Sequence, residues 1–295
     1  MMLRRSEAWN LRYHKFIDPM KIAPSHLFLA ALLLLASPGQ ATAAMIRIGG
    51  TGSDLGTMRL LARAFEAVHP QHSVEVLPSL GSSGGIKASL AGAIDIGLTS
   101  RMPREAERIP GTRTFAYAKS PLVLATARDN PEQGLTTRQL VEIFAGDRRR
   151  WADGNLIRLV LRDKSDSDSR ILESLDPDLA TAMENARARR GVPVAFTDQE
   201  AADKLQKLVW GLGPTTLSLI LGEGRPLKAL WLDGVAPTLQ NLASEAYPLV
   251  KTLYLVTGPE PEPAAESFIA FLRSDAGRAI LERTGHLVLD GEDRS

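Results

Sequence analysis

Three glycine- and serine-rich turns in the first third of the chain have the composition of an anion-binding site. Residues 49–53 (GGTGS), 81–85 (GSSGG) and 99–101 (TSR) each come directly after a strand-like run. Where a helix opens after such a turn, its first backbone N–H groups lack partners and its dipole favours negative charge. One turn alone is more often only a tight turn, but three at the ends of neighbouring strands favour a shared anion site.

The middle of the chain adds an arginine followed by a serine- and aspartate-rich loop, residues 162–170 (RDKSDSDSR). Arg162 could grip an oxyanion with two N–H groups, and the serine hydroxyls could donate to it. Three aspartates in the same loop would repel an anion, so a solvated acidic loop is the alternative. A calcium loop is disfavoured because the glycine and the distal glutamate of an EF-hand are missing.

The sequence contains no recognisable catalytic motif. There is no cysteine, and beyond residue 44 the histidines are His69, His72 and His286, without metal-ligand spacing. Neither a G-x-S-x-G elbow nor a complete nucleotide-binding fingerprint is present. The Arg148–Arg150 run indicates an exposed loop. We therefore expect a protein that is not an enzyme and holds no cofactor and no metal.

The N-terminal residues have the order of a secretory signal peptide. Lys21 precedes a ten-residue apolar run, residues 27–36, which is too short for an ordinary membrane span, and small residues follow at 41–44. We expect a signal peptide over residues 1–44, with Met20 as an alternative start, and export to the periplasm without a lipid-anchor cysteine. Without residues 1–43 the chain keeps 30 basic and 32 acidic residues, a balance that argues against a nucleic-acid partner.

Strand-like and helix-like runs alternate through the remainder, which predicts an α/β fold with a largely parallel sheet. Strands are expected at 45–50, 73–80, 95–100, 118–127, 156–162, 227–234 and 247–257. Helices are expected at 53–70, 85–94, 136–146, 170–190, 201–222 and 263–285. Thr136 or Thr137 is the expected N-cap of 136–146 and Gly146 its end, and Asp176–Pro177 should interrupt 170–190. The apolar strands 118–127 and 247–257 bracket a block of about 120 residues, as a domain inserted between two hinge crossings would.

Several pieces, in order, resemble a known family. These are GSSGGI, DIGLTSR, SPLVLATARDNP, LTTRQLVEIFAGDRRRW, IRLVLR and the long DGVAPT…YPL…LYLVT. With them the chain resembles type II periplasmic solute-binding proteins, in particular the phosphate-binding subunits of ATP-driven importers. The resemblance implies two lobes, each a mixed sheet flanked by helices, joined by two hinge strands. It places lobe 1 at 45–125 and 250–295 and lobe 2 at 126–249, and implies a monomer that passes an oxyanion, phosphate first, to an ABC-type membrane permease.

The resemblance also implies ligand-contacting residues. From one lobe they are Ser53 with the neighbouring backbone of Asp54, Ser82, Ser83, Ser100 and Arg101, and from the other Arg162, Ser167, Asp168 and Ser169.

Two of these positions depart from the family pattern. Ser100 stands where well-studied phosphate binders have an aspartate, and Asp168 replaces the glycine of a Ser-Gly-Thr turn. Asp168 adds a charge beside Asp166, and like charges ~4 Å apart cost on the order of 4 kcal/mol at an effective dielectric of roughly 20. The alternatives are therefore an altered-ligand or ligand-less signalling or scaffold protein on the same fold and, with less support, an enzyme acting on phosphate esters.

Overall fold

The computed structural model describes residues 43–290, which enclose two separate hydrophobic cores. The first core draws on residues 46–118 and 253–281, and the second on residues 122–249. We call the elements around them lobe 1 and lobe 2. The expected signal peptide lies outside the described residues except for its last two, and the expected lobe limits stay a prediction. Within residues 43–290, no helix is long and apolar enough to cross a membrane.

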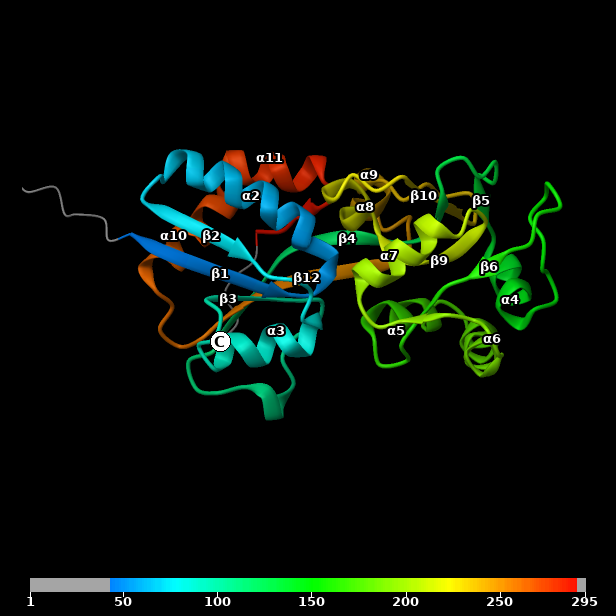
Figure 1. Ribbon diagram of the computed structural model, residues 1–295, viewed down its shortest axis with the longest axis horizontal. Coiled ribbons are helices and arrows are strands. Elements are labelled where there is room, and N and C mark those ends of the chain that lie inside the picture. The colour runs from blue at the N-terminus through cyan, green and yellow to red at the C-terminus, as the bar shows by residue number, and fades with distance from the viewer. Residues whose placement is uncertain (1–42, 291–295) are drawn as a thin grey trace, which may run out of the picture. The chain divides into compact units, whose positions relative to one another are not determined.

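Lobe 1 contains a short parallel sheet with helices on both faces. Its elements are β1 (Ala44–Gly50), η1 (Gly52–Asp54), α2 (Leu55–Val68), β2 (His72–Val76), α3 (Gly81–Leu90), β3 (Ile96–Thr99), η2 (Glu105–Glu107), α10 (Pro263–Arg273), α11 (Asp275–Arg283) and β13 (Leu287–Val288). β1 pairs in parallel with β2 and β3. Figure 1 shows α2, α10 and α11 on one side of these strands and α3 on the other. Helix α2 buries Leu55, Met58, Leu61 and Phe65, the helical spacing expected from the sequence.

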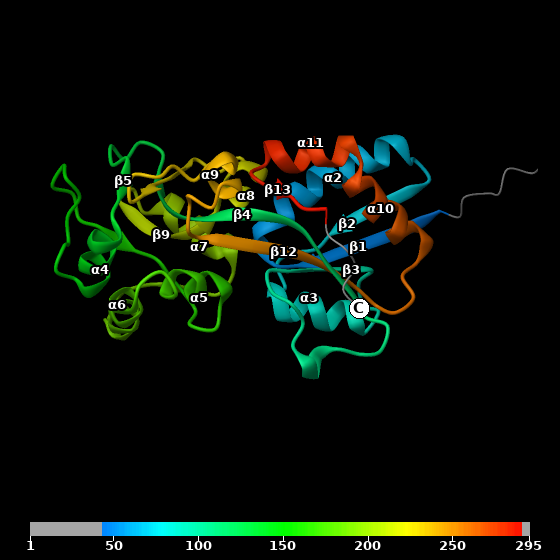
Figure 2. The ribbon, with the colours of Figure 1, turned by 180° about the vertical axis from the view of Figure 1, so that it is seen from behind.

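Two long strands join the lobes. β4 (Arg113–Ala127) and β12 (Val250–Thr257) pair antiparallel, with a shift of register between Leu253 and Tyr254. Figure 2 shows them running side by side from one lobe into the other. The sheet order is β2-β1-β3-β12-β4-β9-β6, with β10 and β13 also on β4. Because β12 runs antiparallel to both neighbours, the sheet is mixed, as the family resemblance implied, and the alternation of elements overstated its parallel character.

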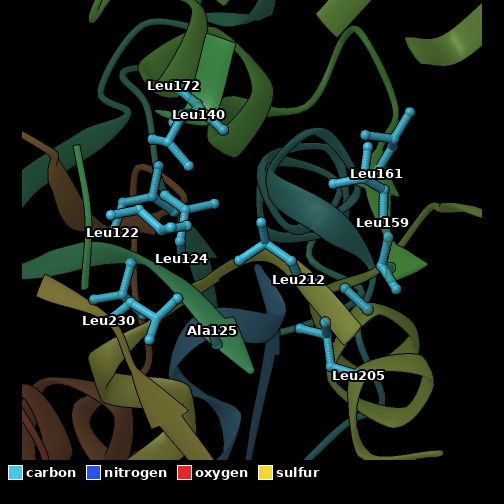
Figure 3. Packing of buried hydrophobic residues seen from close by; sticks show 14 of the residues in the cluster. Leu122, Leu124, Ala125, Leu140, Leu159, Leu161, Leu172, Leu205, Leu212 and Leu230 are labelled. Atoms are coloured by element: carbon cyan, nitrogen blue, oxygen red, sulfur yellow. The ribbon is translucent and has the colours of Figure 1, made fainter. Parts of the chain in front are cut away.

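Lobe 2 is built from short strands and helices around a leucine-rich core. Its elements are β5 (Gly134–Leu135), α4 (Thr137–Ala145), β6 (Arg158–Leu159), β7 (Leu161–Arg162), α5 (Ser167–Glu173), α6 (Pro177–Ala188), β8 (Val194–Ala195), α7 (Asp198–Lys207), β9 (Gly211–Thr216), α8 (Leu217–Gly222), β10 (Leu227–Ala229), β11 (Trp231–Leu232) and α9 (Leu239–Ala243). Figure 3 shows Leu122, Leu172, Leu205 and Leu212 packed in this core.

Helix ends follow the expected sequence signals. Thr136 caps α4 by accepting a hydrogen bond from the Gln139 N–H, and Gly146 ends the helix at a φ of 93°. The expected interruption of the 170–190 stretch is also confirmed. Asp176 caps α6, and Pro177 occupies its first turn, where a missing N–H costs nothing.

Three expectations about elements were wrong. The expected helix 201–222 is interrupted by β9, because Gly213 lets this strand pass the carbonyl oxygen of Val160, which a Cβ would meet at 2.5 Å. The expected C-terminal helix 263–285 breaks at Ser274, whose hydroxyl caps α11. The 81–85 stretch is the first turn of α3 instead of a loop before it, with Gly81 at a φ of +67°.

Candidate functional site

The turn after β1 holds a buried carboxylate from lobe 2. The Gly52 N–H donates to Asp198 Oδ2 at 3.1 Å, and the Ser53 hydroxyl donates to Asp198 Oδ1 at 3.1 Å. The neighbouring Gln199 side chain donates to the Gly52 carbonyl oxygen at 2.7 Å. A Cβ on Gly52 would stand 2.8 Å from that of Asp198, so only glycine permits this approach. The Gly52 N–H and the Ser53 hydroxyl are therefore already bound to a carboxylate.

Asp198 belongs to a buried ion cluster, which also contains Arg162, Asp168 and Lys251. Each of the four residues is at most 4% exposed. The ammonium of Lys251 lies 2.6 Å from Asp168 Oδ1 and 3.3 Å from Asp198 Oδ1. The guanidinium of Arg162 lies 3.7 Å from a carboxylate oxygen of each of these two aspartates. At the edge of the cluster, Asp166 accepts a 2.7 Å hydrogen bond from Arg162, so two cations face three carboxylates.

The two buried aspartates differ in their protonation. Burial raises the pKa of Asp168 to about 6 against the pull of Lys251, and its Oδ2 has no hydrogen-bond partner among the described residues. Burial acts on Asp198 as well, but Lys251, Arg162 and the Ser53 hydroxyl outweigh it and hold the pKa of that carboxyl far below its usual range. Asp168 is therefore the carboxylate that takes up the first proton as the pH falls.

Three hydroxyls from the two lobes meet beside the cluster. Ser82 Oγ in α3 lies 2.9 Å from Ser100 Oγ after β3, and Ser100 Oγ lies 2.9 Å from Ser167 Oγ at the start of α5. The Ser100 N–H also donates to Ser82 Oγ at 3.0 Å. We call these residues the serine triad. Hydroxyls can turn their protons toward an incoming acceptor, so the triad can donate to an oxyanion.

The serine triad borders a cavity of about 340 Å³. Its lining residues are Leu80, Gly81, Ser82, Ser83, Arg101, Arg104, Asp163, Ser165, Asp166, Ser167, Arg170 and Phe196. Arg101 is oriented by a two-pronged contact with Glu107, at 2.7 Å for each oxygen, and donates to Ser83 Oγ at 2.8 Å. The Arg101 hydrogen bond lowers the pKa of Glu107 to about 2, although partial burial opposes it, so the pair stays ionised.

The side chains of Asp54 and Ser169 are turned away from the cleft. The Asp54 carboxylate accepts from the Tyr117 hydroxyl at 2.7 Å and faces His286 Nε2 at 3.2 Å, inside lobe 1. The Ser169 hydroxyl donates to the Arg162 carbonyl oxygen at 3.2 Å. Both side chains serve the local structure, and of the residue pair at the first turn only Ser53 points into the cleft.

The other expected residues fall into two groups. Ser53, Arg162 and Asp168 join the ion cluster. Ser82, Ser83, Arg101 and Ser167 line the cavity. Ser100 is not one of the lining residues and is connected to the cavity through its hydrogen bonds to Ser82 and Ser167. Arg162 Nη1 has no hydrogen-bond partner among the described residues.

Two members of the ion cluster were missed from the sequence. Lys251 had a signal, because a lysine inside the apolar run 247–257 must be buried with a counter-charge. Asp198 had none, since an acidic residue after Thr197 is the ordinary start of a helix, and its partners Gly52 and Ser53 lie about 145 residues away. Among residues 43–290, no group of three acidic or histidine side chains is arranged to hold a metal ion.

Comparisons with known proteins agree with this architecture. Residues 36–276 match the PBP superfamily domain. A phosphate-binding protein of Streptococcus agalactiae is 29% identical over 106 residues, a match that spans 36% of either chain. A phosphate-binding protein of Bacillus subtilis is 22% identical over 252 residues, covering 82% of this chain and 80% of its own.

A solved structure shares the fold. A Clostridium perfringens protein assigned as a phosphate ABC transporter substrate-binding protein, with phosphate bound, superposes at a TM-score of 0.68 and 22% identity, covering 83% of this chain and all of its own.

Proposed function

The chain belongs to the PBP superfamily, and on that premise we propose that it is an exported receptor that binds an inorganic oxyanion, phosphate first, between its lobes. We further propose that it acts as a monomer and hands the anion to an ABC-type membrane permease. The names of the Streptococcus, Bacillus and Clostridium relatives support phosphate as the ligand.

The serine triad is the observation that carries this proposal. Lobe 1 supplies Ser82 and Ser100, and lobe 2 supplies Ser167, so an anion bound there would be held by both lobes. Hydroxyl donors suit phosphate oxygens, and the arginines that line the cavity, Arg101, Arg104 and Arg170, supply positive charge.

Acidic groups line the same cavity, so its positive and negative charges nearly cancel. Asp163 and Asp166 also line it, and Asp166 is neutralised in part by the buried Arg162 at 2.7 Å. Because the Arg101 guanidinium is shared with Glu107, it is held in position but offers less net charge. We therefore expect binding to depend on directed hydroxyl and N–H donors more than on net charge.

Calorimetric titration of the phosphate-free protein with phosphate, sulfate and molybdate tests the proposal. We expect heat of binding for at least one anion, and Ser100→Ala should weaken that binding roughly 10-fold because it removes the hydroxyl that links Ser82 to Ser167. Ser267→Ala is the matched control, since its hydroxyl bonds to Pro263 on the outer helix α10. Absence of heat and of any thermal shift with all three anions at millimolar concentration would overturn the oxyanion proposal.

The excess carboxylate in the ion cluster favours a second candidate, a signalling or scaffold protein that keeps the fold without a ligand. In that case the interlobe contacts at Asp198 would already hold the lobes together. This candidate predicts flat titrations for the unaltered protein and no effect of Ser100→Ala beyond stability.

A further inference from the structure

We propose that the carboxylate of Asp198 is a built-in anion, which fills the turn after β1 and confines any external oxyanion to the serine-triad cavity. The inference rests on the proposed function only for the identity of the external ligand. The position of the carboxylate itself is independent of it.

The partners of Asp198 are those that an oxyanion ligand would require. One oxygen accepts from the Gly52 N–H, and the other accepts from the Ser53 hydroxyl and the Lys251 ammonium. The Arg162 guanidinium stands 3.7 Å away. A backbone N–H at a helix start, a hydroxyl, an ammonium and a guanidinium together make a complete anion site, and both of its oxygen positions are taken.

The charge of the ion cluster disfavours binding of a second anion at the turn after β1. With Asp166, Asp168 and Asp198 ionised, the cluster already has one carboxylate more than its two cations. An added phosphate would be a further buried negative charge with no cation left to pair it. The cavity beside the triad, in contrast, has three arginines against two aspartates in its lining.

The same carboxylate links the lobes. Asp198 is the first residue of α7 in lobe 2, and its partners Gly52 and Ser53 belong to lobe 1. The following residue, Gln199, adds a 2.7 Å hydrogen bond to the Gly52 carbonyl oxygen. The lobes can therefore close at this point without an external ligand. Asp198 determines where an external ligand binds, and it holds the lobes together when no ligand is bound.

Chemical rescue of Asp198→Ala by small carboxylates tests the inference. The variant empties an anion site, so acetate or formate should raise its Tm by about 3–5 °C more than that of the unaltered protein. Asp203→Ala is the control, because this aspartate lies on the same helix but half exposed, paired with Arg225. Equal carboxylate responses in all three proteins would overturn the inference.

Phosphate titration of Asp198→Asn separates this inference from the proposed function and covers the case in which the alanine variant does not fold. The amide keeps the shape and removes the charge, so we expect phosphate to bind about 10-fold tighter than to the unaltered protein. Equal phosphate affinity in the two proteins would count against Asp198 as a competing anion while leaving the receptor proposal standing. Carboxylate rescue without phosphate binding in any variant would support the built-in anion and overturn phosphate as the ligand.

Discussion

Two strand-to-helix turns in lobe 1 have similar sequences and positions, but they differ in what faces their hydrogen-bond donors. The turn after β1 opens η1 and α2, and the turn after β2 opens α3, both at the carboxyl ends of parallel strands. At the turn after β1, the Asp198 carboxylate accepts from the Gly52 N–H and the Ser53 hydroxyl, in a buried cluster. The second presents Ser82 and Ser83 to a cavity of about 340 Å³.

The difference lies in what lobe 2 places opposite each turn. Helix α7 brings a carboxylate to Gly52, whereas helix α5 brings the Ser167 hydroxyl to the serine triad. A strand-to-helix turn therefore creates the capacity for anion binding, and the facing lobe decides whether that capacity remains available for a ligand. The first turn should accordingly behave as a structural element and the second as a binding element.

Removal of Lys251, at the centre of the ion cluster, should give the largest loss of stability. Lys251→Met leaves Asp168 and Asp198 buried without the ammonium that joins them, and we expect a loss of about 3–5 kcal/mol in the free energy of unfolding. Urea denaturation, with the m value compared between proteins, measures this loss.

Lys119→Met is the matched control for the lysine substitution. Lys119 lies on the adjacent strand β4, opposite Thr252, and is only half-buried. We expect a change below about 1 kcal/mol there. If Lys251→Met cost no more than this control, the cluster would not depend on its ammonium and the contrast between the two turns would be unfounded.

The contribution of the Asp168 carboxyl to the stability of the protein should fall as the pH rises between about 4 and 6. Burial raises the pKa of Asp168 to about 6 from a usual value of 3.8, so the folded state binds this proton more tightly than the unfolded state does. The resulting stabilisation is complete below pH 4 and lost as the pH rises through 6, an effect on the order of 1–3 kcal/mol. Asp168→Asn should flatten this slope in denaturation curves recorded from pH 4 to 7, and an unchanged slope would assign the proton elsewhere.

The sequence predicted more of the fold than of the candidate site. Periodicity and caps placed α2, α4 and the connecting strands, because these depend on local residue patterns. It missed β9, a buried strand whose glycines and threonines show no helix- or strand-specific period.

At the site, the sequence indicated which residue types take part, but it did not indicate which residues pair with one another. The expected hydroxyls Ser82, Ser100 and Ser167 do lie together, but nothing local in the sequence could show that Ser53 faces Asp198, some 145 residues away. Long-range pairing of charges is decided by how the lobes pack, which a single sequence does not record.

A pair of identical substitutions, one in each turn, gives the smallest and most direct test of the comparison. Ser53→Ala removes a hydroxyl that donates to a buried carboxylate, and we expect it to cost about 1.5 kcal/mol in the free energy of unfolding. Ser82→Ala removes a half-buried hydroxyl that bonds to the Ser100 hydroxyl at 2.9 Å and accepts from the Ser100 N–H at 3.0 Å. Because both partners are uncharged, we expect a smaller cost, of about 1 kcal/mol.

Anion affinity should show the reverse order in the same two variants. Ser82→Ala takes a donor from the cavity and should weaken phosphate binding several-fold, whereas the hydroxyl lost in Ser53→Ala was already engaged by Asp198. Calorimetry on both proteins under one buffer condition supplies the measurement. A larger loss of affinity in Ser53→Ala than in Ser82→Ala would place the external anion at the first turn, and Asp198 would then have to move aside for it.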